Sequence, residues 1–347
     1  MDKSRYESLD FLRGICALSI MIYHYTGWTF GHYAASNVIG RIGVYGVSMF
    51  YVLSGLTMYL VYYKNFTFSK TFFLNFYIKR FFRIYPLMWF VIIISYIIIG
   101  TKNNCSQQLI IASGLFSVFD WSASTPLGMW SIGNELSFYL LLPFIFIAFK
   151  TNKIIGFMLS SLFFFIYIYF AFYKFNPLIE GVSEDLNYKN PLNQAALFVG
   201  GILIGYFFKE KQFKPVFINI LCLVGLLLFC YYPCNGELRN TYLGINRLVF
   251  TFICFIITLG FFKIEFNYVS NKIKGILSWL GEISYSLYLM HGLVWSIVLF
   301  TGIKIRYILP ISFILSFLVS HFIYKFLESP ARNFGYKLLK NNKPTIY

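Results

Sequence analysis

The chain alternates long apolar runs with short polar segments from end to end. Runs of about 17–25 apolar residues are long enough to cross a hydrocarbon core of about 30 Å as helices. The pattern therefore predicts an all-α integral membrane protein with about ten transmembrane helices. The predicted spans are 9–30, 42–63, 84–100, 136–149, 154–173, 192–208, 216–232, 245–262, 276–300 and 306–327.

One further apolar stretch, "LIIASGLFSVF" at 109–119, is too short to span a membrane. It is predicted to be an interfacial or re-entrant piece. The chain has no internal repeat and no linker rich in Pro, Gly or Ser. We therefore expect one polytopic membrane domain over 1–335, followed by a basic cytoplasmic tail at 336–347.

Composition supports this class. Of the 347 residues, 58% are hydrophobic and 12% are charged, whereas a soluble domain keeps about a quarter of its residues charged. The net charge of +16 would suit a nucleic-acid-binding protein, but its distribution follows the membrane. Most basic residues fall in loops that are inner if the N-terminus is cytoplasmic, and this asymmetry predicts that both termini are cytoplasmic. The charge then indicates contact with anionic lipid, not nucleic acid.

Two features of the chain limit other interpretations. Arg13 interrupts the first apolar run, and no small-x-small cleavage site follows it, so no cleavable signal peptide is predicted. Of the six cysteines, only Cys105 and Cys234 fall in predicted outer loops. A disulfide is open to this pair, but we expect free thiols. The cysteines show no metal-ligand spacing, and no metal site is predicted.

The first span carries ionisable residues, which are costly in a bilayer and therefore candidates for function. Arg13 and His24 lie about 20° apart around the helix and about 16 Å apart along it. Asp10 lies one turn from Arg13 and is expected to pair with it. This stripe predicts a polar cavity that crosses much of the membrane. The alternative is that Arg13 reaches lipid phosphate and His24 only packs.

The segment "KRFFRIYP" at 79–86 opens the third predicted span. Arg80 and Arg83 share one face of the predicted helix start, where the helix dipole would help them hold a multiply charged phosphate ligand. Lys79 adds a third positive charge. Pro86 fits the first turn of such a helix. The alternative is a basic anchor on the cytoplasmic side.

Polar residues also recur at the predicted outer ends of two other spans. In "WSIGNELSFYLLLP" (130–143), Glu135 lies at the depth predicted for His24, with Tyr139 one turn later. We expect Glu135 and His24 to meet, although a capping charge is the alternative.

In "LGEISYSLYLMH" (280–291), Ser284, Tyr288 and His291 share a helix face. His291 falls near the depth of His24, and a structural helix contact is the alternative to a cavity. Ser54 and Gly55 in "FYVLSGL" are expected to serve close helix packing.

Six of these segments together resemble a known family. "RGICALSIMIYH", "FYVLSGL", "RFFR", "WSIGNELSFY", "SYSLYLMH" and "ESPARNF" occur in the order seen in membrane acyltransferase family 3. The resemblance covers about residues 9–334.

The resemblance implies an O-acetyltransferase of the bacterial cytoplasmic membrane. Its donor would be cytoplasmic acetyl-CoA, and its acceptor a hydroxyl of a cell-envelope polysaccharide or lipid-linked glycan. Carried over by motif, Arg13 and His24 match an essential pair, Arg80 and Arg83 match the donor motif, and Glu135 matches an acidic site residue. No resident cofactor is implied. Because the tail is short, we expect the chain to act alone or to pass acetyl groups to another protein.

The residues suit this chemistry. Arg80, Arg83 and Lys79 would hold the phosphates, and the donor arm would pass Arg13 toward His24. His24 would act as general base or as transient acyl carrier, with Glu135 fixing its tautomer. A proton-coupled glycolipid transporter or flippase is the alternative function. The acceptor glycan and a homo-oligomeric state stay open.

Overall fold

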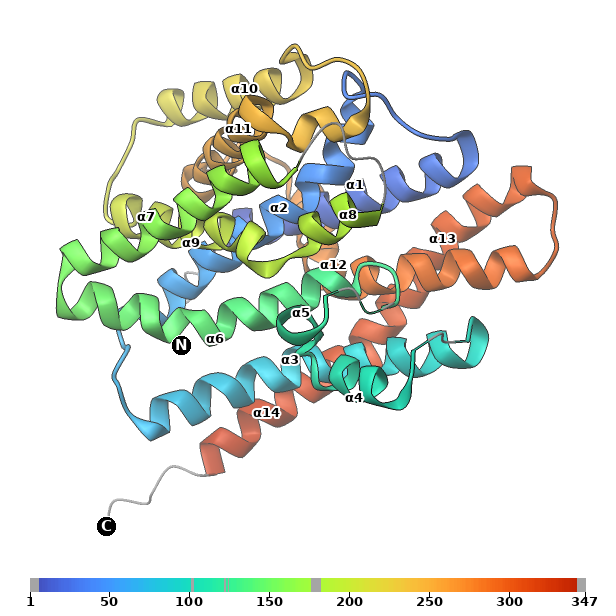
Figure 1. The fold of residues 1–347 in the computed structure, drawn as a ribbon, viewed down its shortest axis with the longest axis horizontal. Coiled ribbons are helices and arrows are strands. Elements are labelled where there is room, and N and C mark those ends of the chain that lie inside the picture. Colours follow the sequence, from blue (N-terminus) through green and yellow to red (C-terminus); the bar gives the residue numbers. More distant parts are fainter. Residues whose placement is uncertain (1–5, 101–102, 122, 124, 176–181, 342–347) are drawn as a thin grey trace.

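The computed structural model describes residues 6–100, 103–121, 123, 125–175 and 182–341. Helices make up 83% of the structure, so the predicted all-α class is confirmed. The helices pack as one elongated bundle (Figure 1). They are α1 Glu7–Phe30, α2 Val38–Met58, α3 Lys70–Ile98, α4 Cys105–Ser113, α5 Phe116–Phe119, α6 Met129–Thr151, α7 Lys153–Tyr169, α8 Val182–Lys189, α9 Pro191–Phe208, α10 Pro215–Tyr231, α11 Gly244–Lys263, α12 Asn271–Phe300, α13 Ile305–Ile323 and α14 Ser329–Asn341.

Three short π-helical segments and one 3₁₀ turn complete these elements. Tyr59–Tyr63 extends α2, Phe170–Lys174 extends α7, and Tyr324–Glu328 joins α13 to α14. The 3₁₀ turn, Leu238–Tyr242, precedes α11. Because of the π segment, α13 and α14 run on as one apolar helix from Arg306 to Leu339.

Within the described residues, eight helices are long and apolar enough to cross a membrane, fewer than the ten predicted. The predicted spans 9–30 and 216–232 do form helices, α1 and α10, but are not among the eight. The polar residues of α1, Asp10, Arg13 and His24 among them, lower its mean hydropathy, and α10 has only 17 residues. The eight candidate spans confirm the prediction of a multi-pass membrane protein.

The third helix begins much earlier than predicted. Its N-cap is Ser69, whose hydroxyl accepts a hydrogen bond from the backbone N–H of Phe72. Arg80 and Arg83 therefore lie in the third and fourth turns, too far from the N-terminus for the helix dipole to act on them. Pro86 lies inside the helix, not in its first turn. The prediction failed because the aromatic segment before Lys79 continues the helix.

The short stretch at 109–119 forms parts of α4 and α5, which have 9 and 4 residues. Neither can span a bilayer. Tyr6 and Tyr336 line the same cavity, so the two ends of the described chain lie at one end of the bundle. That this end faces the cytoplasm stays a prediction. Residues 342–347 of the expected tail lie outside the described residues.

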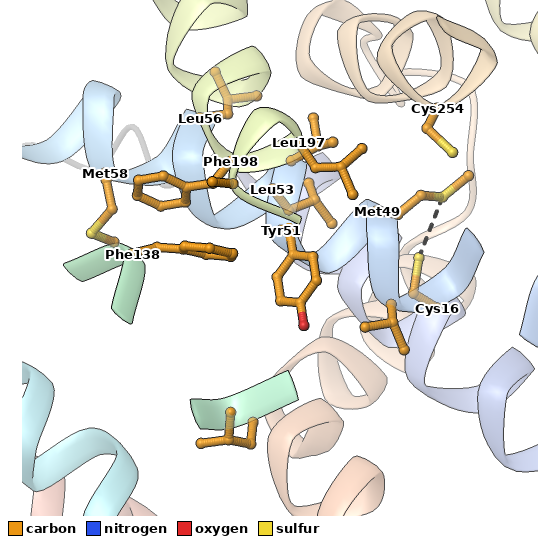
Figure 2. Packing of buried hydrophobic residues seen from close by; sticks show 14 of the residues in the cluster. Cys16, Met49, Tyr51, Leu53, Leu56, Met58, Phe138, Leu197, Phe198 and Cys254 are labelled. Carbon is orange, nitrogen blue, oxygen red and sulfur yellow. Dashed lines mark hydrogen bonds between the residues drawn. The ribbon is translucent and has the colours of Figure 1, made fainter. Parts of the chain in front are cut away.

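Helix α2 occupies the centre of the core. Figure 2 shows Leu53 and Leu56 of α2 beside Leu197 and Phe198 of α9, with Phe138 of α6 against them. All five side chains are buried. The Cys16 thiol of α1 also donates to Met49 Sδ of α2 at 3.6 Å. This core fixes α2, and with it the polar residues on the opposite side of the same helix.

Close packing of α2 against α9 depends on two glycines. A Cβ at Gly55 would collide with the backbone carbonyl of Phe198, and a Cβ at Gly201 would collide with that of Val52. The packing role predicted for Gly55 is therefore confirmed. Helices α1 and α12 cross in the same way, because a Cβ at Gly14 would lie 2.7 Å from the backbone nitrogen of Gly281.

All six cysteines are free, as expected for Cys105 and Cys234. Cys105 is exposed on α4, whereas Cys234 is buried before the 3₁₀ turn. Burial raises the pKa of the Cys234 thiol, which disfavours its reactive thiolate form.

We expect Gly55→Leu to destabilise the protein, because the new side chain would meet backbone that cannot move aside. Overpacking costs about 1–3 kcal/mol where side chains can adjust, and the loss here should be at least that large. The midpoint of thermal unfolding in detergent measures it. The matched control is Gly275→Leu on α12, since a Cβ at Gly275 meets open space. Equal midpoints for the two variants would contradict this account of the α2–α9 contact.

Candidate active site

A cavity of about 640 Å³ lies between α1, α2, α3, α6 and α12. Its volume falls within the range of about 300–1,000 Å³ typical of ligand sites. Lys64, Lys209 and Tyr336 line it at the end of the bundle where the described chain starts and finishes. Phe50, Ser131 and Tyr288 line it deeper in the bundle. The cavity thus runs from one end of the protein into its interior.

Seven basic side chains line the cavity, against three acidic ones, Asp10, Glu135 and Glu282. Positive potential focused in a cleft with apolar walls attracts anionic ligands. The basic residues that line it are Arg13, Lys64, Lys79, Arg80, Arg83, Lys209 and Arg332.

Arg80 is held in a fixed position by aromatic side chains. Its Nη2 donates to the Tyr62 hydroxyl at 2.8 Å, and its guanidinium lies 5.4 Å from the Tyr62 ring centroid and 5.5 Å from that of Tyr139. Its buried Nε has no hydrogen-bond partner among the described residues. Arg83 lines the cavity one turn further along α3. The sequence prediction that Arg80 and Arg83 face one space is confirmed.

Arg13 lies further inside the cavity. Its guanidinium pairs with the Asp10 carboxylate, as predicted, and also donates to the Thr57 hydroxyl. Thr57 in turn donates to the carbonyl of Leu53 at 2.7 Å. These bonds hold Arg13 on the cavity wall, where the paired charge is better tolerated than an isolated one.

Glu135 lines this cavity but does not meet His24, which corrects the sequence prediction. Its carboxylate accepts hydrogen bonds from Ser54 Oγ at 3.0 Å and from the Tyr139 hydroxyl. No interaction joins it to His24 among the described residues. The prediction matched the two residues by depth alone, whereas contact also depends on the rotation of each helix about its axis.

Ser54 is the residue whose place sequence reasoning missed. A small residue beside Gly55 was expected only to allow close packing, yet its hydroxyl lines the cavity and binds Glu135. The signal that could have found it is the three-residue spacing to Thr57, which places two hydroxyls on one face of α2.

Hydrogen-bonded groups line the inner end of the cavity. The hydroxyls of Tyr288 and Ser131 lie 2.8 Å apart. Each lies within hydrogen-bond distance of the carbonyl of Gly128, at 3.2 and 2.9 Å. Phe50 packs edge-on against Tyr288, with the ring centroids 5.8 Å apart. Ser284 also lines the cavity, as expected.

His24 lies outside this lining. It does not line the cavity, so the polar passage expected to run from Arg13 to His24 ends short of the histidine. The His24 ring stacks on those of His291 and Trp28, at centroid distances of 5.3 and 5.2 Å. His291 lies 6.1 Å from Tyr288 by the same measure. Ring contacts through His291 therefore connect Tyr288, which lines the cavity, to His24.

Comparison with known proteins identifies the family of this chain. The acyltransferase domain family (acyltransferase 3) matches residues 6–325. The chain belongs to this family. O-acetyltransferase OatA of Staphylococcus aureus strain NCTC 8325 / PS 47 is 26% identical over 381 residues, covering 97% of this chain and 59% of OatA. A putative O-acetyltransferase of S. aureus strain COL is 26% identical over 377 residues, with the same coverages.

The chain thus spans 59% of the length of these relatives. The family match and the apolar helices together make this protein a multi-pass membrane protein of the acyltransferase family.

We expect the end of the cavity lined by Lys64 and Lys209 and the end of α1 that carries His24 to face opposite sides of the membrane. In a background with exposed Cys105 changed to Ser, Lys64→Cys should react with a membrane-impermeant maleimide only in inside-out vesicles. Trp28→Cys, at a side chain that is 38% exposed, should react only in intact cells. Labelling of both cysteines from one side of the membrane would contradict this predicted topology.

Proposed function

We propose that this protein moves an acetyl group from cytoplasmic acetyl-CoA to a hydroxyl of a cell-envelope polysaccharide or lipid-linked glycan. Its place would be the bacterial cytoplasmic membrane. The family match supports acyl transfer, and the names of the relatives favour O-acetyl transfer.

The observation that carries the proposal is the basic cavity that extends from one end of the bundle into its interior. Acetyl-CoA has a phosphorylated nucleotide head and a long thin arm. Arg80, Arg83 and Lys79 line the cavity, and guanidinium groups bind phosphate with strong charge-assisted hydrogen bonds. The arm would extend past Arg13 toward Tyr288, which lines the deep end.

Glu135 would then act on the donor side of the site. Its bond to Tyr139, and the contact of Tyr139 with Arg80, connect the carboxylate to the phosphate-binding residues. This arrangement fixes the direction of the Arg80 guanidinium. It replaces the role beside His24 that the sequence suggested.

His24 would act on the acceptor. A neutral imidazole can remove the proton from a sugar hydroxyl as that oxygen attacks the thioester carbon, and the thiolate of CoA leaves. A positioned base of this kind contributes about 10²–10⁴-fold in rate. Alternatively, His24 itself takes the acetyl group and passes it on. On either route the thioester must reach His24, which does not line the cavity, so we expect the Tyr288 and His291 side chains that connect the cavity to His24 to move during the cycle.

We expect His24→Ala to fold normally and to lose acetyl transfer by at least about 10²-fold, because the base or acyl carrier is gone. Acetyl content of the envelope glycans, measured by NMR in cells with and without the gene, provides the test. The matched control is His321→Ala, since His321 lies on the surface of α13 and accepts a hydrogen bond from the Trp279 indole N–H. Normal acetyl content in the His24 variant would contradict the proposed mechanism.

Changing Arg80 and Arg83 together to Gln should raise the KM for acetyl-CoA by about tenfold or more. Each charge-assisted bond to phosphate contributes about 1.5–3 kcal/mol, and the KM for the acceptor should change less. Release of free CoA by purified protein gives both constants. Arg306→Gln, outside the cavity, is the control. An unchanged KM for acetyl-CoA would remove these arginines from the donor site, and no binding of donor under any condition would favour a glycolipid transporter.

A further inference from the structure

His291 is the one histidine of the chain that is fully buried within the bundle, with an exposed fraction of 1%. Its Nδ1 lies 3.2 Å from the carbonyl oxygen of Leu287, one turn earlier on α12. A carbonyl can only accept a hydrogen bond, so Nδ1 must carry the proton. In the neutral ring Nε2 is then a bare lone pair that can only accept.

This Nε2 has no hydrogen-bond partner among the described residues. A buried acceptor without a donor is uncommon in folded proteins and marks either an absent ligand or a functional role. The rings that surround His291 are His24, Tyr25, Trp28 and Tyr288. The Tyr25 hydroxyl is already bound to the backbone carbonyl of His291 and to Ser316, and the Tyr288 hydroxyl to Ser131 and Gly128.

Two of these neighbours, His24 and Trp28, carry a ring N–H that has no acceptor among the described residues. The Trp28 ring lies 6.5 Å from that of His291, and His24 is nearer. Its ring lies 5.3 Å from that of His291 with an interplanar angle of 23°. A small rotation of the His24 side chain, or one bridging water, brings an N–H of His24 to the bare Nε2. The other nitrogen of His24 is then unprotonated.

We propose that His291 is the positioning residue of His24, in the role that the sequence suggested for Glu135. His291 Nδ1–H donates to the Leu287 carbonyl, and His291 Nε2 accepts a hydrogen bond from an N–H of His24. The free nitrogen of His24 is left as the base for the acceptor hydroxyl. The catalytic consequence of this inference rests on the proposed function, whereas the tautomer assigned to His24 does not depend on it.

In transfer, the acceptor hydroxyl gives its proton to the free nitrogen of His24 as the oxygen bonds to the acetyl carbon and the C–S bond breaks. The resulting imidazolium keeps its second proton on the hydrogen bond to His291. In the serine hydrolases a carboxylate holds the histidine in this way. A neutral imidazole does the same positioning without placing a negative charge in the membrane, where it would be costly.

The test uses two substitutions at one position. His291→Phe keeps an aromatic ring against His24 but removes both nitrogens. We expect the turnover number to fall by about 10²–10³-fold, with the KM for acetyl-CoA changed less than about threefold because His291 does not line the donor cavity. His291→Gln offers an amide oxygen as acceptor and should stay within about tenfold of the natural protein.

A second readout separates positioning from simple packing and does not depend on activity. The chain has 4 histidines, so ¹⁵N NMR of histidine-labelled protein in nanodiscs can assign each ring from single substitutions. We expect His24 in one neutral tautomer in the natural protein and in a mixture of tautomers in His291→Phe. His321 is the internal control, because the Trp279 indole N–H donates to its Nδ1 at 3.1 Å and its tautomer should not change.

A His24 tautomer that is mixed in the natural protein, or that is unchanged by His291→Phe, would overturn the proposal. Equal loss of activity in the Phe and Gln variants would also overturn it. A protein that never transfers acetyl groups but shows the tautomer shift would refute the proposed function and leave the positioning role in place. If His291→Phe does not fold, the His24 tautomer in the spectra of the natural protein and of His291→Gln still tests the proposal.

Discussion

The backbone contact between α1 and α12 is the constraint on which the site depends. Gly14 and Gly281 lack side chains where these helices cross, and either Cβ would collide with the other helix. Because the crossing is this close, Asp10 and Arg13 on α1 reach the cavity beside Ser284. About three turns further along, the same pair of helices places the His24 ring against His291. One contact therefore sets both ends of the proposed reaction path.

The two ends differ in their chemistry. At one end arginine and lysine side chains line a cavity, and aromatic rings and hydroxyls fix the direction of Arg80. At the other end the rings of Trp28, His24 and His291 stack on one another, with no charged partner among the described residues. A charge in the membrane interior is costly, so the cations gather where water and an anionic ligand can reach them. A neutral imidazole pair suits the drier end, where a carboxylate would be expensive.

The sequence predicted the all-α membrane class well because the hydropathy that marks a membrane-spanning helix can be read from consecutive residues. It also predicted the Asp10–Arg13 pair, the shared face of Arg80 and Arg83, and the packing of Gly55, since each depends on spacing within one helix or on residue size. It failed where helices meet. Depth alone suggested that Glu135 would reach His24, but the rotation of α6 turns Glu135 toward Ser54 and Tyr139. The start of α3 was missed because its aromatic first turns look like an interfacial loop.

The central claim is that the basic cavity holds the donor with its thioester end pointing toward His24. A structure by cryo-electron microscopy of the protein in nanodiscs with coenzyme A tests this claim most directly. We predict density for the nucleotide phosphates beside Arg80 and Arg83 and for the arm along Arg13, ending near Tyr288. Coenzyme A bound at another surface, or a cavity filled by lipid under saturating coenzyme A, would contradict the account.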